Sequence, residues 1–237
     1  MQEITEALGR EWYGAVEGCD LGCGGSEALL SVDLVVRTGC DTVDRCLPIE
    51  GIIMYFVIEG PDGAGKTTLV DGISRGLDSI EVKYIRTRHP GGTGVGEEIR
   101  KLVKNKTDVS MQRYTEQVLI AADYCEFIES VLKPALSDGI VCISDRSNLV
   151  SGMVYGMAGG VDRAQIEAFQ NISLALGFPP FRLFVLTASM EELLKRRHMD
   201  EIEVTADNKT NTMSIKAKCR FESRGDDFHR KVCDYYC

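Results

Sequence analysis

The chain has 237 residues, enough for one α/β domain with an appended segment, and it carries a net charge of −9. This charge argues against a nucleic-acid-binding protein, which needs a basic face. The sequence has no run of about 18 apolar residues and no basic N-terminus followed by an apolar stretch, so it indicates neither a membrane span nor a signal peptide. We therefore expect a cytoplasmic protein in which most of the nine cysteines are reduced thiols.

The opening 53 residues differ in composition from the rest of the chain. They hold ten carboxylates, three arginines and no lysine, so most of the negative charge lies there. Their apolar residues follow no clear period, apart from one apolar patch at 29–36. We predict that residues 1–53 are an appended segment or a stretch upstream of the natural start, with Met54 as a candidate start. A single domain is predicted at 54–237.

Four of the cysteines lie in this opening segment. The spacing of Cys19 and Cys23 suits a zinc site, whereas Cys40 and Cys46 are loosely spaced and no histidine is near them. A zinc site is therefore the less favoured interpretation.

A phosphate-binding motif follows directly after the change in composition. Residues 54–58 are apolar, and residues 59–68 read E-G-P-D-G-A-G-K-T-T, which fits G-x-x-x-x-G-K-[ST]. The backbone N–H groups of such a loop surround a phosphate, Lys66 adds a charge, and the Thr67 hydroxyl can bind magnesium. A chance glycine-rich turn is the alternative, but the loop lies between a strand pattern and an amphipathic helix, as the motif requires. The residues predicted to bind ATP are Gly60, Asp62, Gly63, Ala64, Gly65, Lys66, Thr67 and Thr68.

Strands and helices alternate through the rest of the chain. Strands are expected at 54–58, 82–87, 140–143 and 182–186, and helices at 66–77, 97–103, 111–136, 150–157, 162–176, 190–197 and 220–236. Residues 198–218 are polar and cannot build a core, so we expect a mobile loop there. The alternation predicts an α/β fold, a parallel sheet with helices on both faces, and ligands at the carboxyl ends of the strands.

A carboxylate stands at the end of the third expected strand. Asp145 follows the apolar residues 140–143, and in phosphate-loop proteins such a carboxylate commonly holds magnesium through water. The alternative is that Asp145 caps the next helix.

From residue 54 onward the sequence resembles the thymidylate kinase family of P-loop nucleoside monophosphate kinases. Five blocks in order carry this resemblance, which makes it specific. They are residues 59–68 (family E-G-x-D-G-A-G-K-T-T), 87–93 with 96–100 (T-R-E-P-G-G-T and G-E-x-I-R), 133–136 (K-P-A-L), 145–146 with Ser151 (D-R-[YH]) and 220–222 (R-x-E).

The resemblance implies an ATP- and Mg²⁺-dependent kinase of deoxynucleoside monophosphates, with dTMP as the first candidate, and by analogy a homodimer. It implies that Arg100 and Arg146 hold the acceptor phosphate beside Ser151, and that Asp62 contacts the sugar 3′-hydroxyl. Together with Lys66, these arginines would neutralise charge on the transferred group. The alternative for each arginine is a solvated surface cation.

The resemblance implies that one more cation near the donor phosphate comes from the expected lid, at about 198–218. Some family members carry an arginine in the phosphate loop where this sequence has Gly63. The resemblance then implies a catalytic arginine from the lid, for which Arg196 and Arg197 are the candidates.

The positions that face the base in the family are changed here. Ile120 and Tyr124 replace the Phe and Arg of F-x-x-x-R, Tyr155 stands ten positions beyond Asp145 where the family has glutamine, and His89 replaces a glutamate. Tyrosine hydroxyls both donate and accept hydrogen bonds, so we expect a broader or shifted base preference. The alternative is that both tyrosines face away from the base.

Two further expectations concern function and the sheet edge. The family continues into a last strand and helix beyond the position of Cys237, so we expect an open sheet edge. The alternatives to a dTMP kinase are a kinase for another deoxynucleoside monophosphate and a P-loop protein that binds nucleotide without turnover.

Overall fold

The computed structural model describes residues 54–105, 110–193, 195–196, 220–221 and 223–236, together with the backbone of a strand at 31–36. Its sheet has the strand order β1-β5-β2-β4-β3. The strands are β1 (Ser31–Val36), β2 (Tyr55–Glu59), β3 (Tyr84–Arg88), β4 (Val141–Asp145) and β5 (Arg182–Thr187). Strands β2 to β5 pair in parallel, and β1 is antiparallel to β5.

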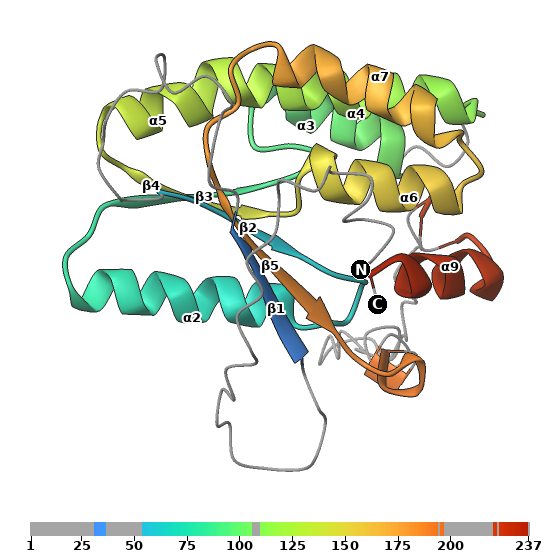
Figure 1. The fold of residues 1–237 in the computed structure, drawn as a ribbon, viewed down its shortest axis with the longest axis horizontal. Coiled ribbons are helices and arrows are strands. Elements are labelled where there is room, and N and C mark those ends of the chain that lie inside the picture. Colours follow the sequence, from blue (N-terminus) through green and yellow to red (C-terminus); the bar gives the residue numbers. More distant parts are fainter. Residues whose placement is uncertain are drawn as a thin grey trace, which may run out of the picture.

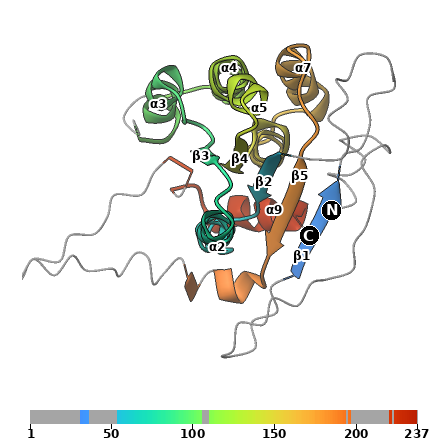
Figure 2. The same cartoon turned by 90° about the vertical axis from the view of Figure 1, so that its left-hand side faces the viewer.

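Helices cover both faces of this sheet. Figure 2 shows α2 on one face and α3, α4, α5 and α7 over the other. The α-helices are α2 (Lys66–Ser79), α3 (Gly94–Arg100), α4 (Arg113–Phe127), α5 (Lys133–Ser137), α6 (Met153–Ala158), α7 (Arg163–Leu174) and α9 (Asp226–Tyr236). Three π-helical turns adjoin them: η2 (Lys101–Asn105), η3 (Ile128–Leu132) and η4 (Asn148–Gly152). The predicted fold class is confirmed.

The core lies on both sides of β2 because alternate residues of a strand point to opposite faces. Tyr55 and Val57 belong to a cluster built with α4, α6 and α9, whereas Ile58 packs in the cluster that includes Val70 of α2. Both faces are therefore apolar, as a covered parallel sheet requires. This arrangement places the carboxyl ends of β2 and β4 beside α2, α6 and α9 (Figure 1).

The sheet edge beside β5, which was expected to be open, is covered by a further strand. Six residues of the apolar patch at 29–36 form β1, with Ser31 opposite Thr187 and Val36 opposite Arg182. The expected open edge is therefore occupied, because a segment rich in valine and leucine suits a strand. The division of the chain at residue 54 stays a prediction.

Some expectations fall on residues outside the described ranges. These are the cysteines Cys19, Cys23, Cys40 and Cys46, the candidate Arg197 and the loop 198–218. Two described cysteines, Cys125 and Cys142, are free thiols. No helix within the described ranges is long and apolar enough to cross a membrane.

Candidate active site

The glycine loop connects β2 to α2 as the motif predicts. Gly60 has φ +137°, and a side chain there would collide with the carbonyl of Leu186 on β5. Gly65 precedes α2 in the left-handed region, with φ +92°. Only glycine adopts both conformations without strain, so the motif glycines are needed for the path of the loop.

Lys66 lies folded over the loop. Its Nζ donates to the carbonyls of Gly60, at 3.0 Å, and Pro61, at 2.8 Å. Burial disfavours its charged form and nearby Arg146 repels it, so the pKa of Lys66 falls to about 8 despite the opposing charges of Asp62 and Asp145. Carbonyl oxygens thus hold the ammonium at the mouth of the loop, where a phosphate oxygen could replace them.

Arg146 makes more contacts than any other predicted site residue that is described. It follows β4 with φ +75°, which is uncommon for a residue with a side chain. One end of its guanidinium donates to Asp62 Oδ1 at 2.5 Å and to the Tyr155 hydroxyl at 3.1 Å. The other end donates to Gly60 O at 3.0 Å and Ser151 Oγ at 3.2 Å. These contacts fix a cation beside the glycine loop.

The charges of Asp62 and Arg146 support each other. Burial opposes ionisation of Asp62, but the positive charges of Arg146 and Lys66 outweigh it and hold the pKa of Asp62 well below its usual value. Burial also disfavours the charged form of Arg146, but the neighbouring Tyr155 and Asp62 raise its pKa well above the usual value. Both groups therefore stay charged near neutral pH.

Glu59 organises the residues behind Arg146. It is fully buried and accepts hydrogen bonds from the backbone N–H of Ser147 at 2.7 Å, from Ser151 Oγ at 2.6 Å and from the Tyr236 hydroxyl at 2.9 Å. Tyr236 also accepts from Arg146, at 3.4 Å. Sequence reasoning missed Glu59, Ser147 and Tyr236 as site residues. The only signal was the family likeness of the loop block that begins with Glu59.

The remaining predicted arginines lie at different places. Arg100 donates to the carbonyl of Pro90 at 2.7 Å, so α3 is tied to the loop after β3. Arg196 donates to Gly63 O at 3.1 Å and to Glu192 at 2.7 Å, so it lies against the glycine loop. The predicted roles of Arg100 at the acceptor phosphate and of Arg196 at the donor phosphate stay predictions.

Two oxygen ligands fit a magnesium ion. Thr67 is exposed on the first turn of α2, and Asp145 Oδ1 is buried without a hydrogen-bond partner among the described residues. A hydroxyl and a carboxylate are the hard oxygen ligands that magnesium prefers. Within the described ranges, no cluster of three or more His, Cys, Asp or Glu side chains could hold a metal.

The two predicted base-facing tyrosines differ in direction. Tyr124 is fully buried with its hydroxyl 3.3 Å from that of Tyr55, so it points into the core. The Tyr155 hydroxyl donates to Asp62 Oδ2 at 3.4 Å and thus points at the glycine loop. Ile120 is 7% exposed and belongs to the same core cluster as both tyrosines.

His89, which replaces the family glutamate, is buried against α4. Its Nδ1 lies 3.2 Å from Asp123 Oδ2, and Asp123 Oδ1 accepts from the backbone N–H of Gly91 at 2.9 Å. The loop after β3 is therefore fastened to α4 by Asp123.

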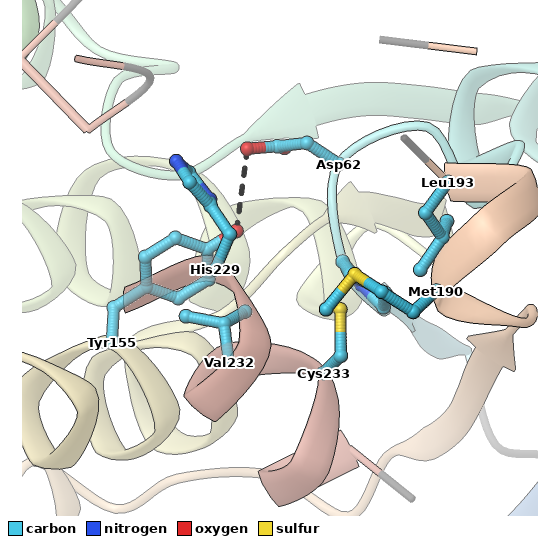
Figure 3. A pocket seen from close by; sticks show the side chains of 8 residues that line it. Asp62, Tyr155, Met190, Leu193, His229, Val232 and Cys233 are labelled. Carbon is cyan, nitrogen blue, oxygen red and sulfur yellow. Dashed lines mark hydrogen bonds between the residues drawn. The ribbon is translucent and has the colours of Figure 1, made fainter. Parts of the chain in front are cut away.

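A small pocket lies beside Asp62 and Tyr155. Figure 3 shows it between the glycine loop, α9 and the helical residues 190–193 and 195–196. Its lining residues are Pro61, Asp62, Tyr155, Met190, Leu193, His229, Val232 and Cys233. The pocket therefore lies between Asp62, the predicted sugar contact, the helical residues 190–193 and α9.

A parallel sheet with a glycine loop between β2 and α2, and with cations gathered at its carboxyl edge, defines a P-loop nucleotide-binding protein of the nucleoside monophosphate kinase class. The family model described as thymidylate kinase matches residues 58–233. The chain belongs to the thymidylate kinase family, a family of phosphotransferases, and the sequence resemblance is confirmed.

Curated relatives agree with this assignment. A protein named thymidylate kinase from Clostridium novyi is 32% identical over 77% of this chain and 82% of its own length. A second, from Symbiobacterium thermophilum, is 36% identical over 77% of this chain and 78% of its own length. A third, from Caldicellulosiruptor saccharolyticus, is 35% identical over 75% of this chain and 78% of its own length.

Proposed function

We propose that this chain transfers the γ-phosphoryl group of ATP to dTMP and so forms dTDP and ADP. The observation that carries the proposal is the convergence of Lys66, Asp62 and Arg146 at the glycine loop, with Arg146 bonded to both Gly60 and Asp62. The family assignment and the names of the relatives support dTMP as the acceptor.

The reaction needs charge neutralisation rather than a general base. An oxygen of the acceptor phosphate is already anionic near neutral pH and forms the new O–P bond, while the bond to the β-phosphate oxygen breaks and ADP leaves. Two anions approach each other in this step, so the enzyme must place cations around the transferred group. Lys66, which is buried, and Arg146, whose side chain is 13% exposed, are cations at this place.

Each loop residue then has a defined task. The backbone N–H groups of the glycine loop and the N-terminus of α2 bind the donor phosphates, and Arg196, which already contacts Gly63 O, supplies further positive charge from the lid side. Arg146 and Arg100 bind the acceptor phosphate, and Asp62 accepts a hydrogen bond from the sugar 3′-hydroxyl.

Magnesium, when bound, neutralises the β- and γ-phosphate oxygens of ATP. Thr67 and Asp145 are the residues that would hold it, the first directly and the second through water. The exposure of Thr67 and the unpartnered Asp145 Oδ1 support this assignment.

The base end of the site supports a second candidate, a kinase for another deoxynucleoside monophosphate. The family arginine that faces the base is Tyr124 here, and its hydroxyl is directed at Tyr55 rather than at an open surface. A site without the fixed donor fork of arginine reads a base less strictly.

A coupled ADP-release assay tests both candidates. The chain with ATP and magnesium is given dTMP, dUMP, dCMP, dGMP and dAMP in turn, and kcat/KM is compared. The highest value for dTMP supports the proposal, and a higher value for another nucleotide supports the second candidate. If none of the five nucleotides leads to ADP, the result favours a protein that binds nucleotide without turnover.

A further inference from the structure

Asp123 of α4 lies where the loop after β3, the helix α3 and α4 meet. Its side chain is fully buried, and both carboxylate oxygens have a partner. Oδ1 accepts from the backbone N–H of Gly91 at 2.9 Å, and Oδ2 lies 3.2 Å from Nδ1 of His89. A side chain at Gly96 of α3 would collide with Oδ1, so α3 approaches the same carboxylate. One buried carboxylate therefore joins three segments of the chain.

His89 supplies the hydrogen bond to Asp123 Oδ2. An ionised carboxylate only accepts hydrogen bonds, so Nδ1 of His89 is the donor in this contact. The residue is 4% exposed, and its Nε2 has no hydrogen-bond partner among the described residues. Its ring meets the rings of Phe127 and Tyr124 in T-shaped contacts, with centroids 4.3 and 4.8 Å away. The imidazole is thus held on α4 by one hydrogen bond and by packing.

The loop that is fastened in this way holds Arg100. The carbonyl of Pro90 accepts from Arg100 Nη1 at 2.7 Å. Pro90 stands between His89 and Gly91, the two residues that Asp123 binds, so its carbonyl is fixed from both sides. A Cβ atom at Gly91 would lie 3.4 Å from Arg100 Cδ, which shows that the loop packs directly on this arginine. The position of the guanidinium therefore depends on the contacts of Asp123.

Two departures from the family pattern are neighbours in this region. The family has glutamate at position 89 and arginine at position 124, whereas this chain has His89 and Tyr124 in ring contact. A glutamate at 89 in this chain would approach Asp123, with tyrosine rather than a cation at 124. Two buried carboxylates next to each other repel when both are charged. Histidine therefore suits the surroundings in this chain better than the glutamate of the family.

We propose that His89 and Asp123 are positioning residues for the acceptor phosphate. Together they fix the carbonyl of Pro90 and, through it, the guanidinium of Arg100. This inference rests on the proposed function and specifies how its acceptor site is built. Neither residue contacts the substrate in this role, and neither belongs to the glycine loop. An arginine that is already oriented spares the ligand the cost of ordering it, so loss of the pair should weaken acceptor binding and leave ATP binding intact.

The test measures kcat, KM for dTMP and KM for ATP in variants of the full-length chain. His89→Phe keeps a ring against Phe127 and Tyr124 but removes the donor, so KM for dTMP should rise about tenfold while KM for ATP changes by less than about twofold. His89→Asn is the conservative variant, because its amide N–H can replace Nδ1 as the donor. It should keep KM for dTMP within about threefold of the unmodified value.

Variants of the carboxylate side complete the test. Asp123→Asn removes one acceptor and should raise KM for dTMP about tenfold, and its combination with His89→Phe should cost little more, because both changes break one contact. Asp138→Asn alters an exposed aspartate after α5 and should change neither KM. Each side-chain variant of His89 retains its backbone N–H, which donates to the carbonyl of Asp145 at 2.9 Å.

The reverse exchange separates the inference from a simple family likeness. His89→Glu should raise KM for dTMP more than His89→Phe does, because it adds a second carboxylate beside Asp123. If His89→Glu instead lowers this KM, histidine is only a weaker substitute for the family residue, and the inference is overturned.

The remaining outcomes also decide the inference. If the unmodified chain phosphorylates dTMP but His89→Phe and Asp123→Asn change both KM values equally or change neither, the inference is overturned while the proposed function stands. Thermal unfolding of each variant shows whether it folds, and loss of folding in both variants would assign the pair to the core alone, which also overturns it. If the unmodified chain forms no ADP, the proposed function fails, and calorimetric binding of dTMP and of ATP to the same variants decides the inference. Selective loss of dTMP affinity, restored in His89→Asn, supports it.

Discussion

Around the glycine loop, Arg146 donates to Asp62 at 2.5 Å and Glu59 accepts from the backbone N–H of Ser147 at 2.7 Å. Along α4, by contrast, the Tyr124 hydroxyl lies 3.3 Å from that of Tyr55, inside the core. The phosphate end is thus assembled before any ligand arrives, as charge stabilisation requires. The predicted base end carries residues unlike those of the family, and Tyr124 there is fully buried. Catalysis and base selectivity should therefore respond to different mutations.

The largest expected effect lies at the phosphate end. Replacing Lys66 or Arg146 with Ala removes a cation from the transferred group, and turnover should fall about 10³-fold or more. The control Lys101→Ala removes an exposed ion pair with Glu98 and should leave the rate unchanged. Steady-state assays with dTMP measure the effect. Near-normal turnover in Lys66→Ala would rule out the kinase assignment.

The lowered pKa of Lys66 gives a prediction about stability. Its pKa is about 8 in the folded chain against 10.5 in the unfolded chain, so the unfolded chain binds more protons between these values. The free energy of unfolding should therefore rise with pH in this window, by at most about 1.4 kcal/mol per pH unit. Below pH 8 the loss of unfolding free energy caused by Lys66 should be constant.

Urea unfolding at pH 7.5, 8.5 and 9.5 of the unmodified chain and of Lys66→Met isolates this contribution. The unmodified chain should gain stability relative to the variant as the pH rises. Parallel curves for the two proteins would show that Lys66 titrates normally and that the loop is more open than its contacts indicate.

The residues that were found from sequence differ in kind from those that were missed. The glycine loop and the pair Asp145-Arg146 are short contiguous motifs whose chemistry can be read from neighbouring residues. Tyr236 bonds Glu59 across 177 positions of sequence, and that approach depends on how α9 packs. Such contacts are set by tertiary packing, so no local pattern indicates them.

The direction of the Tyr155 side chain could not be predicted either. Its place ten positions beyond Asp145 comes from the family pattern, whereas its hydroxyl faces Asp62 and Arg146 because of how η4 and α6 pack after β4. Its role toward the substrate stays a prediction. The parallel sheet, by contrast, followed from the alternation of strands and helices, and the apolar patch at 29–36 became a strand only because β5 offered an edge.

Tyr236 provides a smaller test of the phosphate end. Its hydroxyl donates to the buried Glu59 and accepts from Arg146, so it is a positioning residue for that arginine. Tyr236→Phe should lower kcat by about tenfold with KM for ATP unchanged, because Arg146 loses orientation while the donor site is intact. Tyr235→Phe is the matched control, since this neighbour packs against the core and makes no hydrogen bond with Glu59 within the described residues. Equal effects in both variants would assign the loss to packing instead.

The smallest effect is expected from the opening segment. The described catalytic and binding candidates lie between Glu59 and Tyr236, and β1 contributes only an outer strand beside β5. A chain that begins at Met54 should therefore fold and keep kcat/KM within about twofold, the range of a surface change of about 0.5 kcal/mol. Its thermal midpoint should fall by a few degrees because β5 becomes an edge strand, whose unpaired backbone groups face water. Activity assays and thermal unfolding of the two chains measure both effects. Because Gly60 packs on the Leu186 carbonyl of β5, a strong loss of ATP binding in the shortened chain would show instead that β1 supports the glycine loop through β5.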